Sequence, residues 1–181
     1  FKMTKKDSKK IAIIGGGAAG FFSALTLSDL DPNAEIHLFE KRNQWLSKVK
    51  ISGGGRCNVT HKCFDPKTLS EKYPRGSKEL RAAFHSWQPQ DTIDWFAQRK
   101  IQLKAEADGR MFPTTDDSQT IIDCFLKEAK KSKIKLKKSH SIESLTLNSD
   151  GSFLLKINNE KDTSYHAVCL ALGSLKSSPL E

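Results

Sequence analysis

Apolar and polar positions at the start of the chain follow a simple pattern. Residues 11–14 are uniformly apolar and predict a buried strand, which runs directly into residues 15–20, spaced G-x-G-x-x-G. Residues 21–30 are mostly apolar and predict a helix, and residues 34–40 predict a second strand. Strand, glycine turn, helix and strand in this order are typical of the opening unit of a dinucleotide-binding fold.

The middle of the chain predicts mainly helices. Apolar spacing of the helical kind covers residues 77–87, and Pro89 and Asp91 precede a second helix that runs to Lys100. Residues 62–77 carry prolines and a glycine and predict a loop, residues 101–106 alternate like a strand, and residues 118–131 predict a further helix. The aromatic residues of these helices, Trp87 and Trp95 among them, are interpreted as core in preference to a substrate-facing role.

The last third of the chain predicts strands. Residues 134–138 alternate and are expected to form the third parallel strand of the sheet. Three alternating runs at 141–147, 152–157 and 163–166, separated by turn residues, predict a three-stranded antiparallel meander. Residues 167–172 are continuously apolar, which favours a strand buried on both faces. The fold class predicted is α/β, with a parallel sheet, helices and a meander.

The glycine turn has a specific chemical use. Gly15 would permit the tight turn, Gly17 would let the backbone approach a pyrophosphate, and Gly20 would let the helix pack on the strand. The N-terminus of the helix then offers free N–H groups and partial positive charge to phosphates. A turn without a ligand is the alternative; Glu40, twenty residues beyond Gly20, favours a ligand because an acid at this position accepts hydrogen bonds from a ribose.

A second polar, glycine-rich stretch spans residues 51–61. Ser52, Arg56 and Asn58 surround three consecutive glycines, so the loop could offer backbone N–H groups and a guanidinium to a phosphate or a polar ring. A flexible linker is the alternative. The run Arg-Cys-Asn-Val directly after the glycines favours a ligand loop.

Composition limits the class of protein. The chain has 181 residues, 37% of them hydrophobic and 28% charged, as in an ordinary globular domain. It contains neither a membrane-length apolar run nor a signal-peptide core, which predicts a cytoplasmic protein without a membrane partner. The four cysteines are scattered and are expected to be reduced, and Cys57, His61 and Cys63 lack a credible fourth ligand nearby, so no metal is expected.

The formal net charge is +9, and seven lysines lie between Lys127 and Lys138. No nucleic-acid module or interleaved aromatic platform accompanies them, so a solvated surface is favoured and no specific nucleic-acid partner is expected. Nonspecific attraction to polyanions is the weaker alternative.

The order of these elements resembles the FAD-binding domain of glutathione-reductase-like flavoproteins, in which a meander replaces a crossover helix. Residues 51–60, Ile-Ser-Gly-Gly-Gly-Arg-Cys-Asn-Val-Thr, and residues 106–113, Glu-Ala-Asp-Gly-Arg-Met-Phe-Pro, are similar to two recurring segments of the bacterial NAD(P)/FAD-dependent oxidoreductases of the BaiN type, also described as aminoacetone-oxidase-like. The resemblance runs from Ile11 to about Leu175 and implies a Rossmann-like FAD/NAD(P)-binding domain over residues 11–175, with tails at 1–10 and 176–181.

The resemblance also implies cofactor contacts. The pyrophosphate would lie against Gly15, Gly17, Ala18, Ala19 and Gly20, and the adenosine ribose against Glu40 with Lys41 beside it. The second loop would lie along the pyrophosphate, ribityl chain and flavin through Ser52, Gly53, Gly54, Arg56, Cys57 and Asn58. Ile142 would offer backbone groups to the adenine, and Ala171 and Gly173 would close over the cofactor.

Two departures from the family are visible. The family ends its last strand with Ala-Thr-Gly-Gly, where this chain has Ala-Leu-Gly-Ser at residues 171–174. The family is also about twice as long, which gives the expectation of a fragment, a truncated product or one part of a split protein whose second chain supplies the missing half.

Three functions follow from these observations. The first is an FAD-dependent oxidoreductase, or its FAD-binding portion, with a small-molecule substrate that the sequence does not identify and NAD(P)H as one candidate electron donor. The second is a truncated or decayed nucleotide-binding module without activity, or a remnant that no longer holds FAD, and the third is a Rossmann enzyme that uses NAD. No catalytic residue is assigned, and a structural role is favoured for Cys57 over a redox role because no second cysteine completes a CxxC pair.

Overall fold

The computed structural model describes residues 8–158 and 160–173. The chain divides into two compact units: the first unit is Phe1–Lys48 with Phe125–Glu181, and the second unit is Val49–Cys124. Most of the tail predicted at 1–10, all of the tail at 176–181, and Asn159 lie outside the described residues. The assignment of residues 11–175 to one FAD-binding domain stays a prediction.

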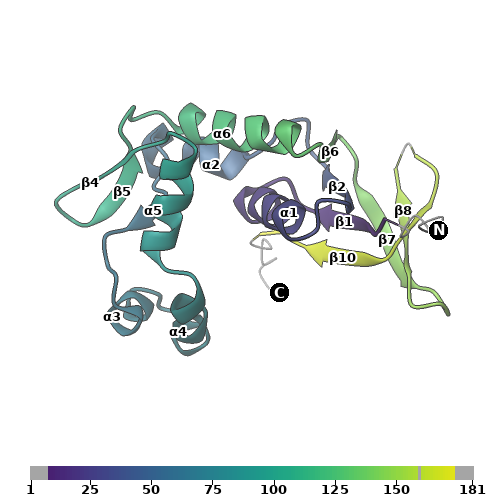
Figure 1. Cartoon of the computed structure of the whole chain (residues 1–181), viewed down its shortest axis with the longest axis horizontal. Helices are drawn as coiled ribbons and strands as arrows, with labels where there is room; N and C mark the ends of the chain where they lie inside the picture. The colour runs from purple at the N-terminus through teal and green to yellow at the C-terminus, as the bar shows by residue number, and fades with distance from the viewer. Residues whose placement is uncertain (1–7, 159, 174–181) are drawn as a thin grey trace, which may run out of the picture. The chain divides into compact units, whose positions relative to one another are not determined.

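A four-stranded parallel sheet forms the centre of the first unit (Figure 1). Its strands are β1 (Lys10–Ile14), β2 (Glu35–Glu40), β6 (Lys135–Lys138) and β10 (Ala167–Leu170), in the order β10-β1-β2-β6. The predicted α/β class is confirmed, and so is the prediction that residues 134–138 supply the third parallel strand.

Helix α1 (Ala18–Leu30) packs against β1 and β2, the strands on either side of it in the sequence. Phe21 is fully buried, and its ring meets Trp45 edge-on with centroids 5.5 Å apart and Phe125 with centroids 5.8 Å apart. Phe125 belongs to α6 (Ser118–Lys131), whose predicted bounds are confirmed. These aromatic contacts fix the start of α1, and with it the glycine turn.

The predicted meander is confirmed as a separate antiparallel sheet of β7 (Ile142–Leu147), β8 (Phe153–Ile157) and β9 (Thr163–Tyr165). A buried cluster joins it to the parallel sheet and comprises Ala12, Phe39, Leu155, Ile157 and Tyr165. Within this core, His37 of β2 lies between the Tyr165 hydroxyl and a Glu35 carboxylate oxygen, each 2.8 Å from a ring nitrogen.

The prediction that residues 167–172 form a strand buried on both faces was wrong. β10 lies at the edge of the four-stranded sheet, and Leu170 and Leu172 are 60% and 57% exposed. A continuous apolar run is compatible with a central strand and with an edge strand. The run alone therefore could not show that β10 lies at the edge of the described sheet.

The second unit contains short elements. Helix α2 (Ser47–Ile51) leads into it, and a 3-10 turn (Ser52–Gly55) follows. Its helices α3 (Pro66–Glu71), α4 (Ser77–Ser86) and α5 (Pro89–Gln98) precede a sheet of order β3-β5-β4. These strands are β3 (Thr60–His61), β4 (Leu103–Ala105) and β5 (Arg110–Pro113).

Two predictions for the second unit were wrong. The loop predicted at 62–77 contains α3, which starts because the Asp65 side chain accepts a hydrogen bond from the Thr68 N–H at 2.7 Å and Pro66 suits the first helical turn. Trp87 is not core: it is 41% exposed, whereas Trp95 is buried as predicted. Helix α4 has no fully buried residue; its apolar Leu80 and Phe84 are half-buried, and the helix packs against α3.

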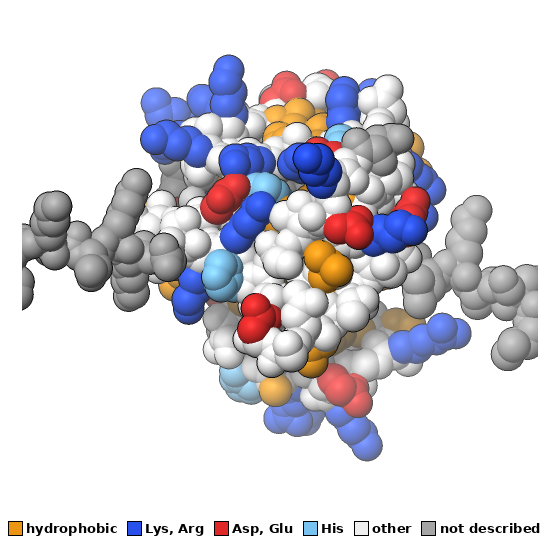
Figure 2. All heavy atoms as spheres, turned by 90° about the vertical axis from the view of Figure 1, so that its right-hand side faces the viewer, with side chains coloured by type: hydrophobic (Ala, Val, Ile, Leu, Met, Phe, Trp, Pro, Cys, Tyr) orange, Lys and Arg blue, Asp and Glu red, His pale blue; other side chains and the backbone are white. Residues whose placement is uncertain are grey.

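Two further features are the length of the helices and the mixture of charges on the surface. Among the described residues, no helix is long and apolar enough to cross a membrane. On the face drawn in Figure 2, basic side chains are interspersed with acidic ones. Two lysines of β6 are paired in this way, Lys135 with Glu35 and Lys137 with Glu160.

Candidate functional site

The glycine turn lies at the carboxyl end of β1, and close packing requires two of its glycines. A Cβ at Gly20 would lie 1.9 Å from the Gly15 carbonyl oxygen, and one at Gly15, where φ is +119°, would lie 2.2 Å from the Ala171 oxygen. Backbone atoms cannot move away as a flexible side chain can. Gly15 and Gly20 therefore hold turn, helix and last strand together.

Gly17 has a different environment. It is the N-cap of α1 with extended backbone, and a Cβ there would meet nothing within 4 Å. The next two residues, Ala18 and Ala19, are exposed. The first N–H groups of a helix have no partner within the helix, so this end of α1 presents donors and partial positive charge toward open space. The arrangement fits a pyrophosphate, for which Gly17 leaves the room.

Glu40 ends β2 beside the turn. Its carboxylate accepts the Gly16 N–H at 3.0 Å and the Arg42 N–H at 2.8 Å, one on each oxygen. Each carboxylate oxygen can accept a second hydrogen bond, so Glu40 is held in position with acceptor capacity left for ribose hydroxyls. Lys41, the next residue, is exposed.

Sequence reasoning missed Gly16 and Trp45. A Cβ at Gly16 would lie 2.4 Å from the Trp45 ring and 2.8 Å from the Glu40 Cβ, and the Gly16 carbonyl accepts the Leu46 N–H at 2.8 Å. The middle glycine thus lets Glu40 and the segment after β2 close onto the turn. The run of three glycines and the nearby tryptophan were the signals available.

The remaining predicted contact residues of the first unit follow the end of β10, as Ala171 and Gly173 do, or begin β7, as Ile142 does. Ala171 donates its N–H to the Ile14 oxygen at 2.8 Å, which places it against the glycine turn. Gly173 is exposed with φ of +73°. Ile142 follows His140, whose N–H bonds the Glu40 backbone oxygen at 3.0 Å. The structure therefore brings Gly15, Glu40 and Ala171 together and starts β7 close to the end of β2.

The second loop is an ordered turn rather than a flexible linker. Gly53, Gly54 and Gly55 all have positive φ, and the Cys57 N–H closes the turn on the Ser52 oxygen at 3.0 Å. The Ser52 hydroxyl donates to the Val49 oxygen at 2.9 Å. A Cβ at Gly53 would lie 2.6 Å from the Phe112 ring, whereas one at Gly54 would meet nothing within 4 Å. The loop thus has one packed side and one open side.

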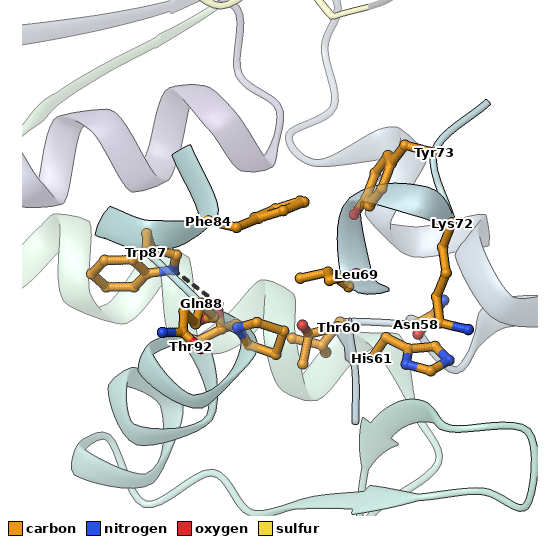
Figure 3. A pocket seen from close by; sticks show the side chains of 12 residues that line it. Asn58, Thr60, His61, Leu69, Lys72, Tyr73, Phe84, Trp87, Gln88 and Thr92 are labelled. Carbon is orange, nitrogen blue, oxygen red and sulfur yellow. Dashed lines mark hydrogen bonds between the residues drawn. The ribbon is translucent and has the colours of Figure 1, made fainter. Parts of the chain in front are cut away.

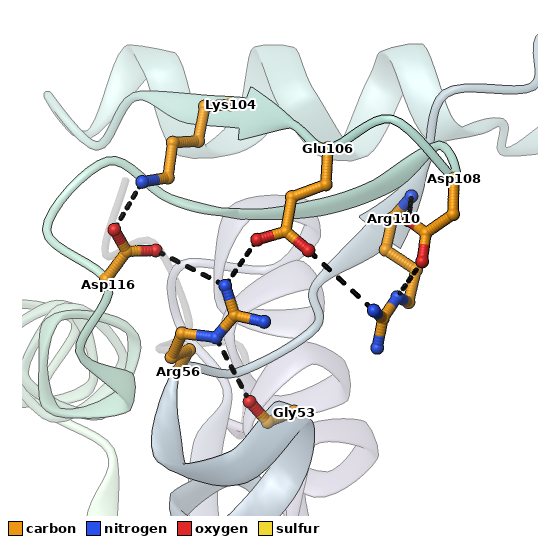
Figure 4. Close-up of polar contacts among 7 residues, drawn as sticks. All are labelled: Gly53, Arg56, Lys104, Glu106, Asp108, Arg110 and Asp116. Carbon is orange, nitrogen blue, oxygen red and sulfur yellow. Dashed lines mark hydrogen bonds and ion pairs between the residues drawn. The ribbon is translucent and has the colours of Figure 1, made fainter.

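Arg56 fastens this loop to the β4–β5 hairpin (Figure 4). Its guanidinium pairs with Glu106, lies 3.8 Å from an Asp116 oxygen and stacks over the Phe112 ring at 4.0 Å. The hydrogen bond to Glu106 raises the pKa of the guanidinium, which is charged in any case. Arg56 thus has structural partners, and the phosphate contact implied by the family resemblance stays a prediction.

Cys57 and Asn58 are neighbours in the sequence but differ in exposure. Cys57 is buried, with a left-handed φ of 65°, and burial raises the pKa of its thiol. A thiol held protonated is a weak nucleophile, which agrees with a structural role. Asn58, the next residue, is exposed. Within the described ranges, no group of three His, Cys, Asp or Glu side chains could hold a metal ion.

Comparison with known proteins identifies relatives. Residues 9–180 match the family described as HI0933-like protein Rossmann domain, and the match confirms the expected resemblance. The chain is 25% identical over 171 residues to the 3-dehydro-bile acid delta(4,6)-reductase of Clostridium scindens, covering 94% of this chain and 40% of the relative. It is 28% identical over 146 residues to the ribosomal RNA dihydrouridine synthase of Escherichia coli, covering 81% of this chain and 35% of the relative. The chain therefore spans about two fifths or less of these relatives' length.

Solved structures confirm the fold. The 3-ketosteroid-delta4-(5alpha)-dehydrogenase of Rhodococcus jostii superposes with a TM-score of 0.62 at 12% identity, over 93% of this chain and 47% of that one. The FrdA chain of Escherichia coli quinol fumarate reductase gives 0.63 at 14% identity, over 91% and 32%. The fold is accordingly the Rossmann-like, FAD-binding type.

Proposed function

The chain belongs to the HI0933-like Rossmann-domain family, and from this premise we propose that it is the FAD-binding part of a flavin-dependent oxidoreductase. One observation carries the proposal. The open backbone at Gly17 and the anchored carboxylate of Glu40 lie on either side of one glycine turn. This is the pair of groups that a dinucleotide's pyrophosphate and ribose require.

The chain's own residues would bind and orient the cofactor. The first turn of α1 would hold the pyrophosphate, and Glu40 would accept hydrogen bonds from the ribose. The open side of the Ser52–Gly55 turn would offer backbone donors, with Arg56 keeping that turn in place. When bound, a flavin supplies hydride or electron transfer.

We infer a reductive direction from the relatives' names. A delta(4,6)-reductase and a dihydrouridine synthase both have names that denote the saturation of carbon–carbon double bonds. Such a saturation adds a hydride and a proton to the two carbons, and we propose NAD(P)H as the source of the hydride equivalent. The substrate itself is proposed to be a small molecule.

Two other functions are the alternatives. An NAD-binding Rossmann enzyme would use the same glycine turn, but the meander between β6 and β10 favours the flavoprotein arrangement. A nucleotide-binding module without activity, or a decayed remnant, is favoured by residues 171–174, which are Ala-Leu-Gly-Ser where the family has Ala-Thr-Gly-Gly.

The proposed setting follows from the composition. We propose a cytoplasmic protein with neither a specific nucleic-acid partner nor a membrane partner. A second chain that supplies the rest of the relatives' length is proposed as a further partner.

Reconstitution tests the proposal. The purified chain is incubated with FAD, NAD or NADP, and uptake is followed by flavin absorbance after desalting and by the thermal unfolding midpoint. We expect FAD alone to be retained and to raise the midpoint, because a ligand that binds only the folded state at a hundred times its Kd adds about 2.7 kcal/mol. Stabilisation by NAD without FAD would favour the Rossmann enzyme, and no effect of any nucleotide would favour the decayed remnant that no longer holds FAD.

A further inference from the structure

The second unit contains a cavity of about 470 Å³, and among the described residues that line it Asn58 alone is a predicted cofactor contact (Figure 3). It starts at Asn58, directly after the glycine loop, and extends past α3 to the ends of α4 and α5. Cavities of roughly 300–1,000 Å³ are those that enclose small organic ligands. Its volume is therefore sufficient for a ligand of several rings.

One side of the cavity is apolar. Leu69, Tyr73 and Phe84 lie together on it in Figure 3, and the Tyr73 and Phe84 rings are 5.5 Å apart and tilted by 46°. Tyr73 and Trp87 lie on opposite sides of the cavity in Figure 3 and are 43% and 41% exposed, so each leaves apolar surface uncovered. A ligand with an apolar ring system would cover them.

The other side is polar and firmly built. Asn58 and Thr60 lie along it, and His61 is held by its Nε2 against the Asp108 oxygen at 3.1 Å. Gly109 packs on the His61 ring, since a Cβ there would lie 2.5 Å from it. The Asn58 amide and the Thr60 hydroxyl can orient a ligand's carbonyl or hydroxyl groups.

The charge of the lining favours an anion. Among the described residues that line the cavity, Lys72 alone carries a permanent charge and none is acidic. In Figure 3, Lys72 lies at the same end as Asn58 and His61, opposite Trp87. A ligand with its rings toward Trp87 and its anionic group toward Lys72 would match both ends.

We propose that this cavity binds the substrate of the proposed oxidoreductase, a rigid and mostly apolar ring system that carries one anionic group. That the ligand is the substrate of the enzyme rests on the proposed function, whereas the binding of such a ligand in the cavity does not. A single nucleobase is the less suitable occupant, because the tilted Tyr73 and Phe84 rings do not form the parallel walls that sandwich one flat base.

The test uses anilinonaphthalene sulfonate, a fluorescent anion with aromatic rings, titrated into the chain with and without saturating FAD. We expect saturable one-to-one binding in both preparations. Phe84→Ala should weaken it at least about tenfold, and Lys72→Met about three- to fivefold. Lys72→Met should leave the neutral analogue phenylnaphthylamine unaffected. Phe64→Ala and Lys67→Met, which change exposed residues outside the cavity, are the matched controls and should bind as the original chain does.

Competition identifies the ligand class. Cholate, an anion with fused rings, should displace the dye at lower concentration than uridine monophosphate. The proposal is overturned if Phe84→Ala and Lys72→Met bind the dye like their controls, or if the nucleotide displaces the dye first. A chain that fails to take up FAD but gives the expected dye results would contradict the proposed function and leave the cavity assignment intact.

Discussion

Glycine is required for different physical reasons in the two glycine-rich segments, residues 15–20 of the first unit and residues 53–55 of the second. In the first unit, Gly15 and Gly20 are required by contact, because any Cβ would overlap backbone oxygen atoms. In the second unit, Gly54 and Gly55 are required by conformation, since both have positive φ while a Cβ would meet nothing within 4 Å. The first segment is closely packed and leaves space only at Gly17. The second is a turn that packs on Phe112 through Gly53, is open at Gly54, and is held by the Arg56 side chain.

The comparison extends to the polar groups that support each segment. The first unit buries His37 between Glu35 and Tyr165 in its core. The second unit uses the partly exposed ion pairs of Arg56 with Glu106 and Asp116. The stability of the first unit is therefore expected to depend on pH, and that of the second unit on salt, because salt screens exposed ion pairs more than buried ones.

The largest effect is expected at the packed scaffold. Gly20→Ala places a Cβ 1.9 Å from the Gly15 oxygen, so helix and turn must separate, at a cost of about 3 kcal/mol or more. Urea unfolding followed by circular dichroism measures it. Gly17→Ala is the matched control, with a change within about 1 kcal/mol because its Cβ meets open space. Equal losses in the two variants would contradict the packing account.

A smaller effect is expected at the side chain that holds the open turn. Arg56→Met removes the ion pairs to Glu106 and Asp116 and the stacking on Phe112. The fold should persist while hydrogen exchange at the Cys57 N–H, which closes the turn on Ser52, becomes faster. High salt should reproduce part of this in the original chain. Arg81→Met, which changes an exposed arginine of α4, is the control and should leave that amide unchanged.

The smallest effect is expected in the buried polar core. Burial lowers the pKa of His37 below its usual value of 6.5, so the unfolded chain takes up the proton first as pH falls and stability is lost below that value. His37→Gln should therefore lose less stability than the original chain between about pH 7.5 and about pH 5.5. Glu35, with a pKa of about 2, titrates below this window. An identical pH dependence in both proteins would contradict the burial of a neutral His37.

The sequence predicted most of the first unit and less of the second. Periodicity located β1, α1, β2, α6 and the meander, because long, strongly patterned segments fold as their pattern dictates. It missed α3, where a proline read as a loop signal is the first residue of a helix capped by Asp65. It also placed Trp87 in the core, because apolar spacing on a helix does not reveal whether a partner covers that face.

The candidate site shows the same division. The spacing of Gly15, Gly17, Gly20 and Glu40 was readable because each is fixed by its distance from a predicted strand end. The roles of Gly16 and of Arg56 were not, since both depend on contacts with Trp45 and Glu106 that only the folded chain brings close. The cavity beside Asn58 is lined by residues of four separate elements, β3, α3, α4 and α5, and left no local signal.

We propose that the dinucleotide binds at Gly17, the open position of the glycine turn. The most direct measurement is FAD affinity, by quenching of flavin fluorescence, for the original chain and for Gly17→Ala at matched stability. The account predicts stoichiometric binding by the original chain and affinity at least about tenfold weaker in Gly17→Ala, because the added methyl occupies the space that Gly17 leaves for the pyrophosphate. Equal affinity in the two proteins, or no binding by the original chain, would contradict it.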